Sequence, residues 1–339
     1  MTRLSIRATR GWLGPGQAVD DVQVVCEQGV VTYAGAVTPI HEDVDLVLDG
    51  FLMPAVADRH VHIELSDPAA VLRGGVTAVR DLAWPPERIF PLADLSEMPS
   101  FDGPLIRAAG PMLTALGGYP TRSGWAPEGT GRVVADPPTA VEAVTELAAS
   151  GATAVKVALN SEAGPTPDDA VLTAICDAAH AAALPVTVHA QGSGQVERAL
   201  GAGVDELAHT PWSRLSDDVV ARCARSLRIV STLGILGSGS PELAAALDNL
   251  GRFRAAGGIV GYGTDLGNAD VPPGVHVREL LLLEEAGFPP EEVLRAITRA
   301  PLEVDAPADV LALGRDPFAD LGAFEDIRLV VRAGRVVAT

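Results

Sequence analysis

The middle of the chain, from about Pro54 to Pro301, alternates short runs rich in Val, Ile and Ala with longer stretches rich in Ala and Leu. The short apolar runs are typical of buried strands, and the longer stretches predict helices. Regular alternation of the two is the pattern of βα units, whose strands lie parallel in a sheet that helices cover. This feature restricts the middle of the chain to an α/β fold.

The region contains eight candidate strands, expected at residues 55–62, 76–81, 105–109, 154–159, 185–190, 206–209, 229–233 and 259–265. Helices are expected between them, among others at 140–150, 168–183, 194–202, 217–226 and 241–256. Eight such units can close into a (β/α)8 TIM-like barrel. The segment 111–138 is rich in Gly and Pro and too long for a simple connection, which favours a role at a functional site.

Both ends of the chain have a different character, with short β-rich segments such as VQVVCEQGVVTYAGAV and IRLVVRAGRVVAT. These segments predict antiparallel strands joined by tight turns. We expect residues 1–53 and 305–339 to pair into one small composite β-sandwich domain. This domain would flank a barrel domain over residues 54–304.

Composition narrows the range of partners. The formal net charge of −19 argues against nucleic acids and anionic membranes, which are bound by clustered Lys and Arg, and favours a small-molecule substrate. No apolar run is long enough to span a membrane, and the first residues lack the apolar core of a signal peptide, so we expect a cytoplasmic protein. The cysteines Cys26, Cys176 and Cys223 have neither zinc-site nor disulfide spacing, and we interpret them as buried packing residues.

Lys156 is the single Lys in the chain, whereas the other basic residues, out of 25, are all Arg. Arg cannot replace Lys where a neutral amine or a modified amine is required, because the guanidinium group always stays protonated. A surface lysine without a special role is the other interpretation, and composition alone leaves both open.

Potential metal ligands gather at the predicted strand ends. A barrel carries its active site at the carboxyl ends of the strands. The first strand ends in His60 and His62, which alternation places on the same face. The fourth strand carries Lys156, and the remaining candidates at strand ends are His189, His209 and Asp265.

Each candidate also has a structural interpretation. Asp265 could cap the following helix, and a lone histidine in a strand is often a hydrogen-bonded core residue. We prefer structural roles for His41, in the small domain, and for His180, in a helix. His276, in the loop after the eighth strand, stays undecided. The combination at one end of the barrel favours a metal site more than any member does alone.

The order HxH, Lys, His, His, Asp over strands one, four, five, six and eight resembles the amidohydrolase superfamily. The resemblance is to its binuclear branch, which includes dihydroorotases, hydantoinases, phosphotriesterases and metal-dependent dipeptidases, and it extends over nearly the whole chain. The segments VTAVRDL, GAGVDELAHT, GFPPEEVLRAIT and ADVLALGRDPFADL are similar to those of dipeptidase and imidazolonepropionase-like members.

The resemblance implies a role for each ligand. His60, His62 and Asp265 would hold the more buried of two divalent metal ions, and His189 with His209 the more exposed one. Lys156 would bridge the two ions as a carbamate formed with carbon dioxide. Zinc is the first choice for four imidazoles, with manganese, cobalt and iron as alternatives.

The resemblance also implies an activity, the hydrolysis of a C–N bond in a small amide, cyclic amide or dipeptide-like substrate. A hydroxide held between the metal ions would be the nucleophile. Asp265 would carry its proton to the leaving amine. Lactone or ester hydrolysis on the same centre is an alternative.

Residues just past the strand ends are candidate substrate contacts: Tyr119, Arg122, Gln191, Trp212 and His276. Dipeptidase-like members tend to have Gly-Gly-His after the third strand, where this chain has Gly-Gly-Tyr at 117–119. That difference puts dipeptidase specificity in doubt.

Two other functions compete with this hypothesis. Deaminases of the same superfamily bind a single metal and resemble HxxE after the fifth strand, whereas here Ala190, Gln191 and Gly192 follow His189. A non-catalytic barrel that serves as a binding protein would be expected to have lost ligands. Homo-oligomers are common in the family, and the sequence indicates no particular interface.

Overall fold

The computed structural model describes residues 3–38, 43–268 and 271–337. Each of the eight predicted strands has a counterpart in it. They are β5 (Val56–Val61), β6 (Val76–Asp81), β7 (Leu105–Ala108), β10 (Val155–Asn160), β11 (Val186–Gln191), β12 (Glu206–Leu207), β13 (Arg228–Val230) and β14 (Ile259–Gly261). Two further short strands, β8 (Met112–Thr114) and β9 (Gly131–Val133), lie within the long segment 111–138. The βα pattern of the sequence is therefore confirmed.

These strands form two parallel sheets. One has seven strands in the order β14-β13-β12-β11-β10-β8-β9, and the other has three in the order β5-β6-β7. Backbone hydrogen bonds join the sheets at both seams. At one seam the amides of Arg59, His62 and Asp265 donate to the carbonyls of Tyr262, Leu266 and His60 over 3.0, 2.7 and 2.8 Å. At the other the Thr153 amide donates to the Ala108 carbonyl over 2.9 Å. The mixed α/β architecture is thus as predicted, whereas the closed barrel stays a prediction.

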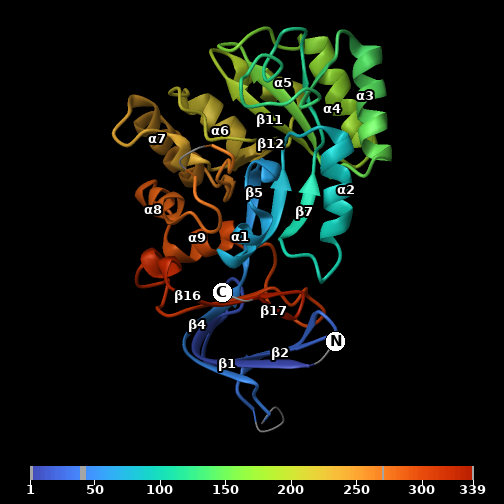
Figure 1. Ribbon diagram of the computed structural model, residues 1–339. Coiled ribbons are helices and arrows are strands. Elements are labelled where there is room, and N and C mark those ends of the chain that lie inside the picture. Colours follow the sequence, from blue (N-terminus) through green and yellow to red (C-terminus); the bar gives the residue numbers. More distant parts are fainter. Residues whose placement is uncertain (1–2, 39–42, 269–270, 338–339) are drawn as a thin grey trace.

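Helices cover the outside of the parallel sheets (Figure 1). They are α1 (Pro68–Arg73), α2 (Pro86–Ser96), α3 (Pro137–Ala149), α4 (Asp169–Ala181), α5 (Gln195–Ala202), α6 (Asp217–Ser226), α7 (Pro241–Ala255), α8 (Val277–Glu285) and α9 (Pro290–Ile297). Several begin at side chains that accept a hydrogen bond from the first turn, such as Asp136, Asp168, Ser216 and Ser240. All five predicted helices are present.

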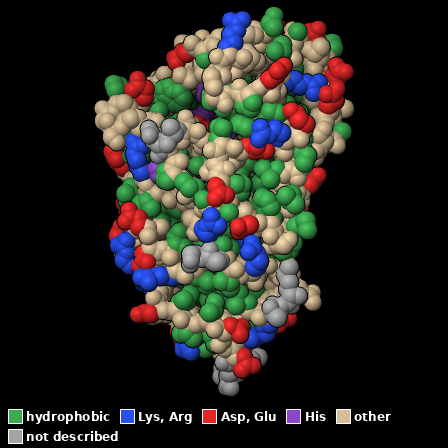
Figure 2. Space-filling view, viewed as in Figure 1, with side chains coloured by type: hydrophobic (Ala, Val, Ile, Leu, Met, Phe, Trp, Pro, Cys, Tyr) green, Lys and Arg blue, Asp and Glu red, His purple; other side chains and the backbone are tan. Residues whose placement is uncertain are grey.

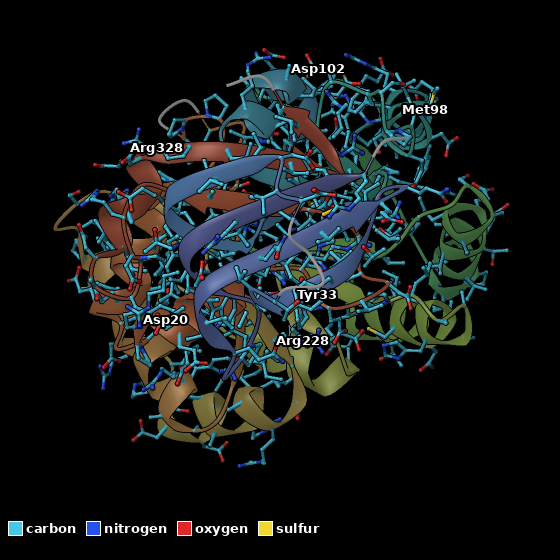
Figure 3. The ribbon with its side chains drawn as sticks, turned by 90° about the horizontal axis from the view of Figure 1, so that it is seen from below. Asp20, Tyr33, Met98, Asp102, Arg228 and Arg328 are labelled. Atoms are coloured by element: carbon cyan, nitrogen blue, oxygen red, sulfur yellow. The ribbon has the colours of Figure 1, made fainter. Side chains whose placement is uncertain are left out.

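The two ends of the chain pair as predicted, but in one sheet. Its order is β17-β16-β15-β4-β1-β2-β3, with β1 (Leu4–Trp12), β2 (Ala18–Glu27), β3 (Val30–Ala36), β4 (Leu46–Pro54), β15 (Val310–Leu313), β16 (Ile327–Arg332) and β17 (Arg335–Val337). We call it the terminal sheet. β4 hydrogen-bonds to both β1 and β15, which makes the ladder continuous, and the division into a composite sandwich domain and a barrel domain stays a prediction. Figures 1 and 3 show this sheet curving below the α/β body.

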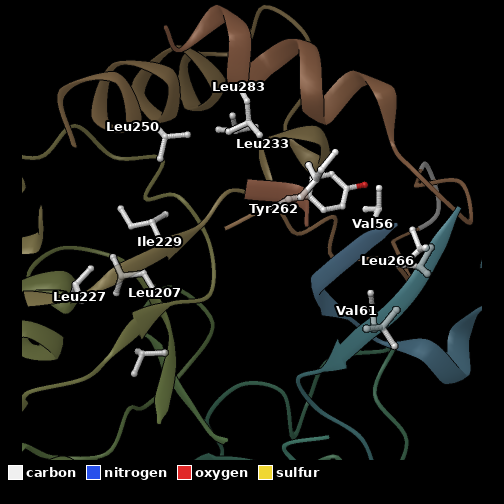
Figure 4. Close-up of a cluster of buried hydrophobic side chains, with 14 of the residues drawn as sticks. Val56, Val61, Leu207, Leu227, Ile229, Leu233, Leu250, Tyr262, Leu266 and Leu283 are labelled. Atoms are coloured by element: carbon white, nitrogen blue, oxygen red, sulfur yellow. The ribbon is translucent and has the colours of Figure 1, made fainter. Parts of the chain in front are cut away.

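Apolar side chains fill the space between the parallel strands and the helices, and Figure 4 shows part of this core. Leu207 and Ile229 from the strands and Leu250 and Leu283 from the helices are almost fully buried there. All three cysteines are free and buried, as predicted. No helix in the described ranges is long and apolar enough to cross a membrane.

Two glycines give a matched test of this packing. A Cβ on Gly74 would lie 2.5 Å from the Gly274 Cα, so Gly74→Ala should lower the free energy of unfolding by about 1–3 kcal/mol. Gly201 lies in α5 with nothing within 4 Å of its Cβ position, so Gly201→Ala should raise it by about 0.5–1 kcal/mol. Urea denaturation measures both, and equal effects of the two changes would contradict the close backbone contact.

Candidate metal centre

Three of the predicted ligands, His60, His62 and Asp265, lie together at the carboxyl end of β5 and in the loop that follows β14. The Nε2 atoms of His60 and His62 lie 3.2 and 3.4 Å from the same carboxylate oxygen of Asp265. One ligand atom of each residue falls within 4.8 Å of the others, and all three residues are buried. Asp265 reaches this position with a left-handed backbone, at φ 57°. This group can hold a metal ion.

The other ring nitrogens of these histidines are already engaged. The Nδ1 of His60 lies 2.8 Å from the Ala208 carbonyl oxygen, and the Nδ1 of His62 lies 3.2 Å from that of Ala83. When Nδ1 donates to a carbonyl, Nε2 is left as the acceptor, and this is how metal-binding imidazoles are usually oriented. Both Nε2 atoms therefore face Asp265 in the form that binds a cation.

His189 and His209 extend the cluster across the strand ends. The ring centroid of His209 lies 4.6 Å from that of His60 and 4.7 Å from that of His189. The Nδ1 of His209 pairs with the Thr232 hydroxyl at 2.9 Å, which again leaves Nε2. In His189 the pattern is reversed, because Nε2 lies 3.1 Å from both Asn160 Nδ2 and Gln191 Oε1. Its free nitrogen is Nδ1.

Lys156 lies in the interior of the body, on β10, and its side chain is fully buried. Its Nζ has no hydrogen-bond partner among the described residues. Burial lowers the pKa of the amine from 10.5 to about 7, against the attraction of Asp265. Burying an amine without a hydrogen-bond partner lowers the stability of the fold. The presence of Lys156 at this position therefore indicates a role other than packing.

The electrostatics of the cluster favour neutral imidazoles at His60, His189 and His209 beside an ionised Asp265. At His62, burial alone would lower the pKa, but the hydrogen bond with Asp265 raises it. Burial, and then the charge of Lys156, hold the pKa of His60 well below its usual range and lower that of His189 to about 4. Burial also lowers the pKa of His209. For Asp265, burial alone would raise the pKa, but His60 and the other imidazoles hold it well below its usual range. Metal ligands need these same protonation states.

Two buried carboxyl groups that sequence reasoning missed shape the ends of β5 and β6. Asp58 accepts hydrogen bonds from the amides of His60 and Thr264, at 3.0 and 3.1 Å. Asp81 accepts from the amide of Ile63 at 2.8 Å. They fix the backbone on either side of His62. The only signal in the sequence is that each is an acidic residue at a predicted strand.

Aromatic side chains line the cluster. The Tyr119 ring stacks on His189, with centroids 5.1 Å apart, and Trp212 packs edge-on against His209 at 5.9 Å. Trp125 lies 4.6 Å from His62, ring to ring, and its Nε1 donates to the Tyr119 hydroxyl over 3.2 Å. Trp125 was not predicted, since a single aromatic residue in a long loop gives no directional signal.

The remaining candidates differ in position. Gln191 contacts His189, as described, and its Nε2 donates to Glu162 over 2.7 Å. Arg122 is exposed, and its guanidinium group packs over Gly117. His276 is buried before α8, and its Nδ1 has no hydrogen-bond partner among the described residues.

His41 and His180 are the two histidines for which we prefer structural roles. The Nε2 of His180 lies 2.9 Å from Asp205 at the surface, away from the cluster. His41 lies outside the described residues.

A cavity of about 360 Å³ lies past the carboxyl end of β11, between the loops that lead into α5 and α6. Gln191, Trp212 and Glu162 are among the residues that line it. Its size suits a small organic molecule. On the face drawn in Figure 2, histidine atoms show only as small patches between other atoms, in keeping with their burial.

Glu279, on α8, supports the loop after β13 and gives a pH-dependent prediction. It is fully buried and accepts a hydrogen bond from the Leu233 amide at 2.9 Å, and burial raises its pKa from 4.5 to about 7. Between pH 4.5 and about 7 the Glu279 carboxyl is protonated in the folded protein and ionised in the unfolded chain. The folded protein then binds more protons, so this carboxyl makes the free energy of unfolding fall as pH rises. Glu279→Gln should remove that contribution. The free energy of unfolding of the variant relative to wild type should then rise by about 1–3 kcal/mol from pH 4.5 to 7.

Urea denaturation at several pH values checks this, with Glu284→Gln as the control, an exposed residue on the same helix. A constant difference between the Glu279 variant and wild type would contradict the raised pKa.

Comparison with known proteins supports the fold. No protein-family model and no curated protein matches the sequence. Among solved structures, an Xaa-Pro dipeptidase with bound methionine is similar at a TM-score of 0.84 and 20% identity, over 100% of both chains. A proposed prolidase from Bifidobacterium longum has a TM-score of 0.83 and 25% identity over 99% of this chain and 95% of that one. A. niger ochratoxinase has a TM-score of 0.83 and 19% sequence identity, over 99% of this chain and 96% of that one.

Fold and site together define an α/β protein with a candidate metal centre at the carboxyl ends of its parallel strands. Its neighbours, which match it over almost the whole chain, are members of the amidohydrolase superfamily. The chain has the fold of that superfamily, and the resemblance predicted from the order of its site residues is confirmed.

Proposed function

We propose that this protein is a metal-dependent hydrolase that cleaves a C–N bond in a small amide or dipeptide-like molecule. The observation that carries the proposal is the Lys156 amine, fully buried and without a hydrogen-bond partner in the described structure, next to four histidines and Asp265. The charges of Asp265, His60, His189 and His209 all interact with that of Lys156.

The residues present fit a pair of divalent cations. His60, His62 and Asp265 offer one ligand atom each within a small volume, and His189 and His209 have one ring nitrogen free beside them. Imidazole and carboxylate are the ligands that zinc, manganese, cobalt and iron accept, and zinc is our first choice. Bound divalent cations supply Lewis acidity, which lowers the pKa of water and polarises a carbonyl group.

Lys156 would complete the centre as a carbamate. Its amine, with a pKa near 7, is largely neutral at physiological pH and can add to carbon dioxide. In this step the nitrogen forms a bond to the carbon of carbon dioxide and loses one proton to water, which gives a carbamate anion. The product replaces a buried amine that has no hydrogen-bond partner among the described residues by a pair of oxygen ligands for hard or borderline metal ions.

Asp265 would move the proton of the reaction. Its carboxylate stays ionised because the neighbouring imidazoles hold its pKa low. A carboxylate in this state can accept a proton from the attacking water and deliver it to the leaving nitrogen. Tyr119, Trp125 and Trp212 wall the site and would exclude bulk water from it.

The substrate class follows from the neighbours and the cavity. The similar structures include an Xaa-Pro dipeptidase and a prolidase, so a dipeptide or N-acyl amino acid is the first class to test. The aromatic side chains of Tyr119, Trp125 and Trp212 around the histidine cluster favour a substrate with an apolar group beside the scissile bond. Tyr119, stacked on His189, occupies the place where dipeptidase-like relatives tend to have a histidine, so the preferred substrate would differ from theirs.

Lactone or ester hydrolysis is the second candidate function, because the same centre would attack any suitable carbonyl. A panel of substrates separates the possibilities, using protein purified with zinc and bicarbonate. We expect turnover of N-acyl amino acids, Xaa-Pro dipeptides or aryl amides, with kcat/KM at least tenfold above that for matched esters and lactones. Activity on lactones alone, or release of ammonia from nucleobases alone, would contradict the proposal.

A further inference from the structure

A large cavity lies at the opposite end of the body from the candidate metal centre. Its volume is about 700 Å³, and an adjoining cavity of about 460 Å³ shares Glu206, Arg228, Gly257 and Ile259 with it. These residues lie at or next to the amino-terminal ends of β12, β13 and β14, whereas His62, His209 and Asp265 lie beyond the carboxyl ends of β5, β12 and β14. Figure 1 shows β7 pointing away from the terminal sheet, so the amino-terminal ends of the parallel strands lie on the side of that sheet.

Arginines dominate the polar lining of these cavities. They are Arg59, Arg80, Arg225, Arg228, Arg254 and Arg295. They come from β5, β6, α6, β13, α7 and α9, so the fold brings together side chains that are far apart in the sequence. The chain as a whole carries a net charge of −19, which makes a concentration of positive charge at one place unexpected.

Only part of this charge is compensated. Arg80 pairs with Glu206, and Arg254 makes a two-pronged ion pair with Glu292, at 2.7 and 2.9 Å. Arg228, which Figure 3 labels, has no ion-pair partner among the described residues. The same holds for Arg295, on α9, which is exposed.

Arg59 lines the larger cavity with a partly buried guanidinium group that hydrogen bonds hold in place. Its guanidinium group donates to the carbonyls of Ala296 and Thr298 at 2.6 and 2.8 Å, and no carboxylate of the described residues is hydrogen-bonded to it. Arg80 and Arg228 repel its charge, which Glu206 and Asp58 offset in part. An additional anion would relieve this repulsion, since arginine donors bind phosphate and carboxylate groups in a forked geometry.

We infer that this arginine-lined cavity is a binding site for a small polyanion, a molecule with two or more phosphate or carboxylate groups. Its volume lies in the range of ordinary ligand sites. Six arginines line the two cavities, against the carboxylates of Glu206, Glu292 and Asp205, and this excess of positive charge suits a dianion or trianion. None of the predicted metal ligands lines either cavity, although Arg59 directly precedes His60 in β5.

Calorimetric titration of the purified protein with inorganic pyrophosphate, and separately with succinate, tests the site. The test variant is Arg228→Ala/Arg295→Ala, because both side chains are exposed and their loss should leave the fold intact, as circular dichroism can verify. Arg222→Ala is the control, an exposed arginine on α6 that lines neither cavity. We expect saturable binding to wild type and to the control, at least tenfold weaker in the double variant.

The stronger of the two probes assigns the phosphate or the carboxylate class. Absence of saturable binding of both probes to wild type would overturn the inference. So would equal affinity in the double variant, because an anion held at the metal centre would not respond to Arg228 or Arg295.

Discussion

Replacing Lys156 by Met is expected to lower kcat/KM for the amide substrate by roughly 10³-fold or more, the scale on which a preorganised catalytic group contributes. Methionine has a similar length but cannot form a carbamate, so the variant would lose the bridging ligand. The same change should leave the melting temperature unchanged or raise it, because the buried amine makes no hydrogen bond in the described structure. Steady-state kinetics and calorimetry measure the two effects on the same preparation.

The combination of lost activity and retained stability is the decisive feature. A residue that only packs the core would show the opposite, a loss of stability with activity in proportion to the folded fraction. Lys156→Arg provides a second variant, since it retains a positive charge but no amine that can be carbamylated. Activity of Lys156→Met within a few-fold of wild type would remove Lys156 from the mechanism.

Replacing Asp265 by Asn is expected to lower kcat by about 10²–10⁴-fold, the range of general acid–base catalysis. The amide has nearly the same shape but cannot accept the proton, and it removes the negative charge that lies 3.2 and 3.4 Å from His60 and His62. Metal affinity should fall as well. Rapid-mixing kinetics at saturating substrate and metal separates the loss in the chemical step from the loss in metal binding.

Asn268→Ala is the matched control for this change. Its side chain donates to the Asp265 carbonyl over 2.9 Å in the same loop, without reaching the carboxylate. It should retain most of the activity. If Asn268→Ala were as defective as Asp265→Asn, the loop conformation and not the carboxylate would explain both results.

Much of this arrangement could be predicted from the sequence because it follows local periodicity. Alternation in a strand places His60 and His62 on one face, and parallel strands bring their carboxyl ends to one edge. The structure accordingly brings His60, His62 and Asp265 together, with His209 against His60. The metal-binding roles themselves stay predictions.

Other features depend on contacts that no local pattern encodes. Trp125 reaches His62 through a long loop, and Asn160 reaches His189 across neighbouring strands. The single terminal sheet arises because β4 pairs on both sides, which strand propensity does not specify. The arginine-lined cavity draws on six elements, so only the folded chain shows it.

We propose that the cluster of His60, His62, Lys156, His189, His209 and Asp265 holds a pair of metal ions. The most direct measurement is the metal content per chain by elemental analysis, on protein purified with zinc and bicarbonate. We expect about two divalent ions per chain, as a bridged binuclear centre requires. One ion per chain would contradict the bridging role of Lys156, and no metal after supplementation would contradict a metal-dependent hydrolase altogether.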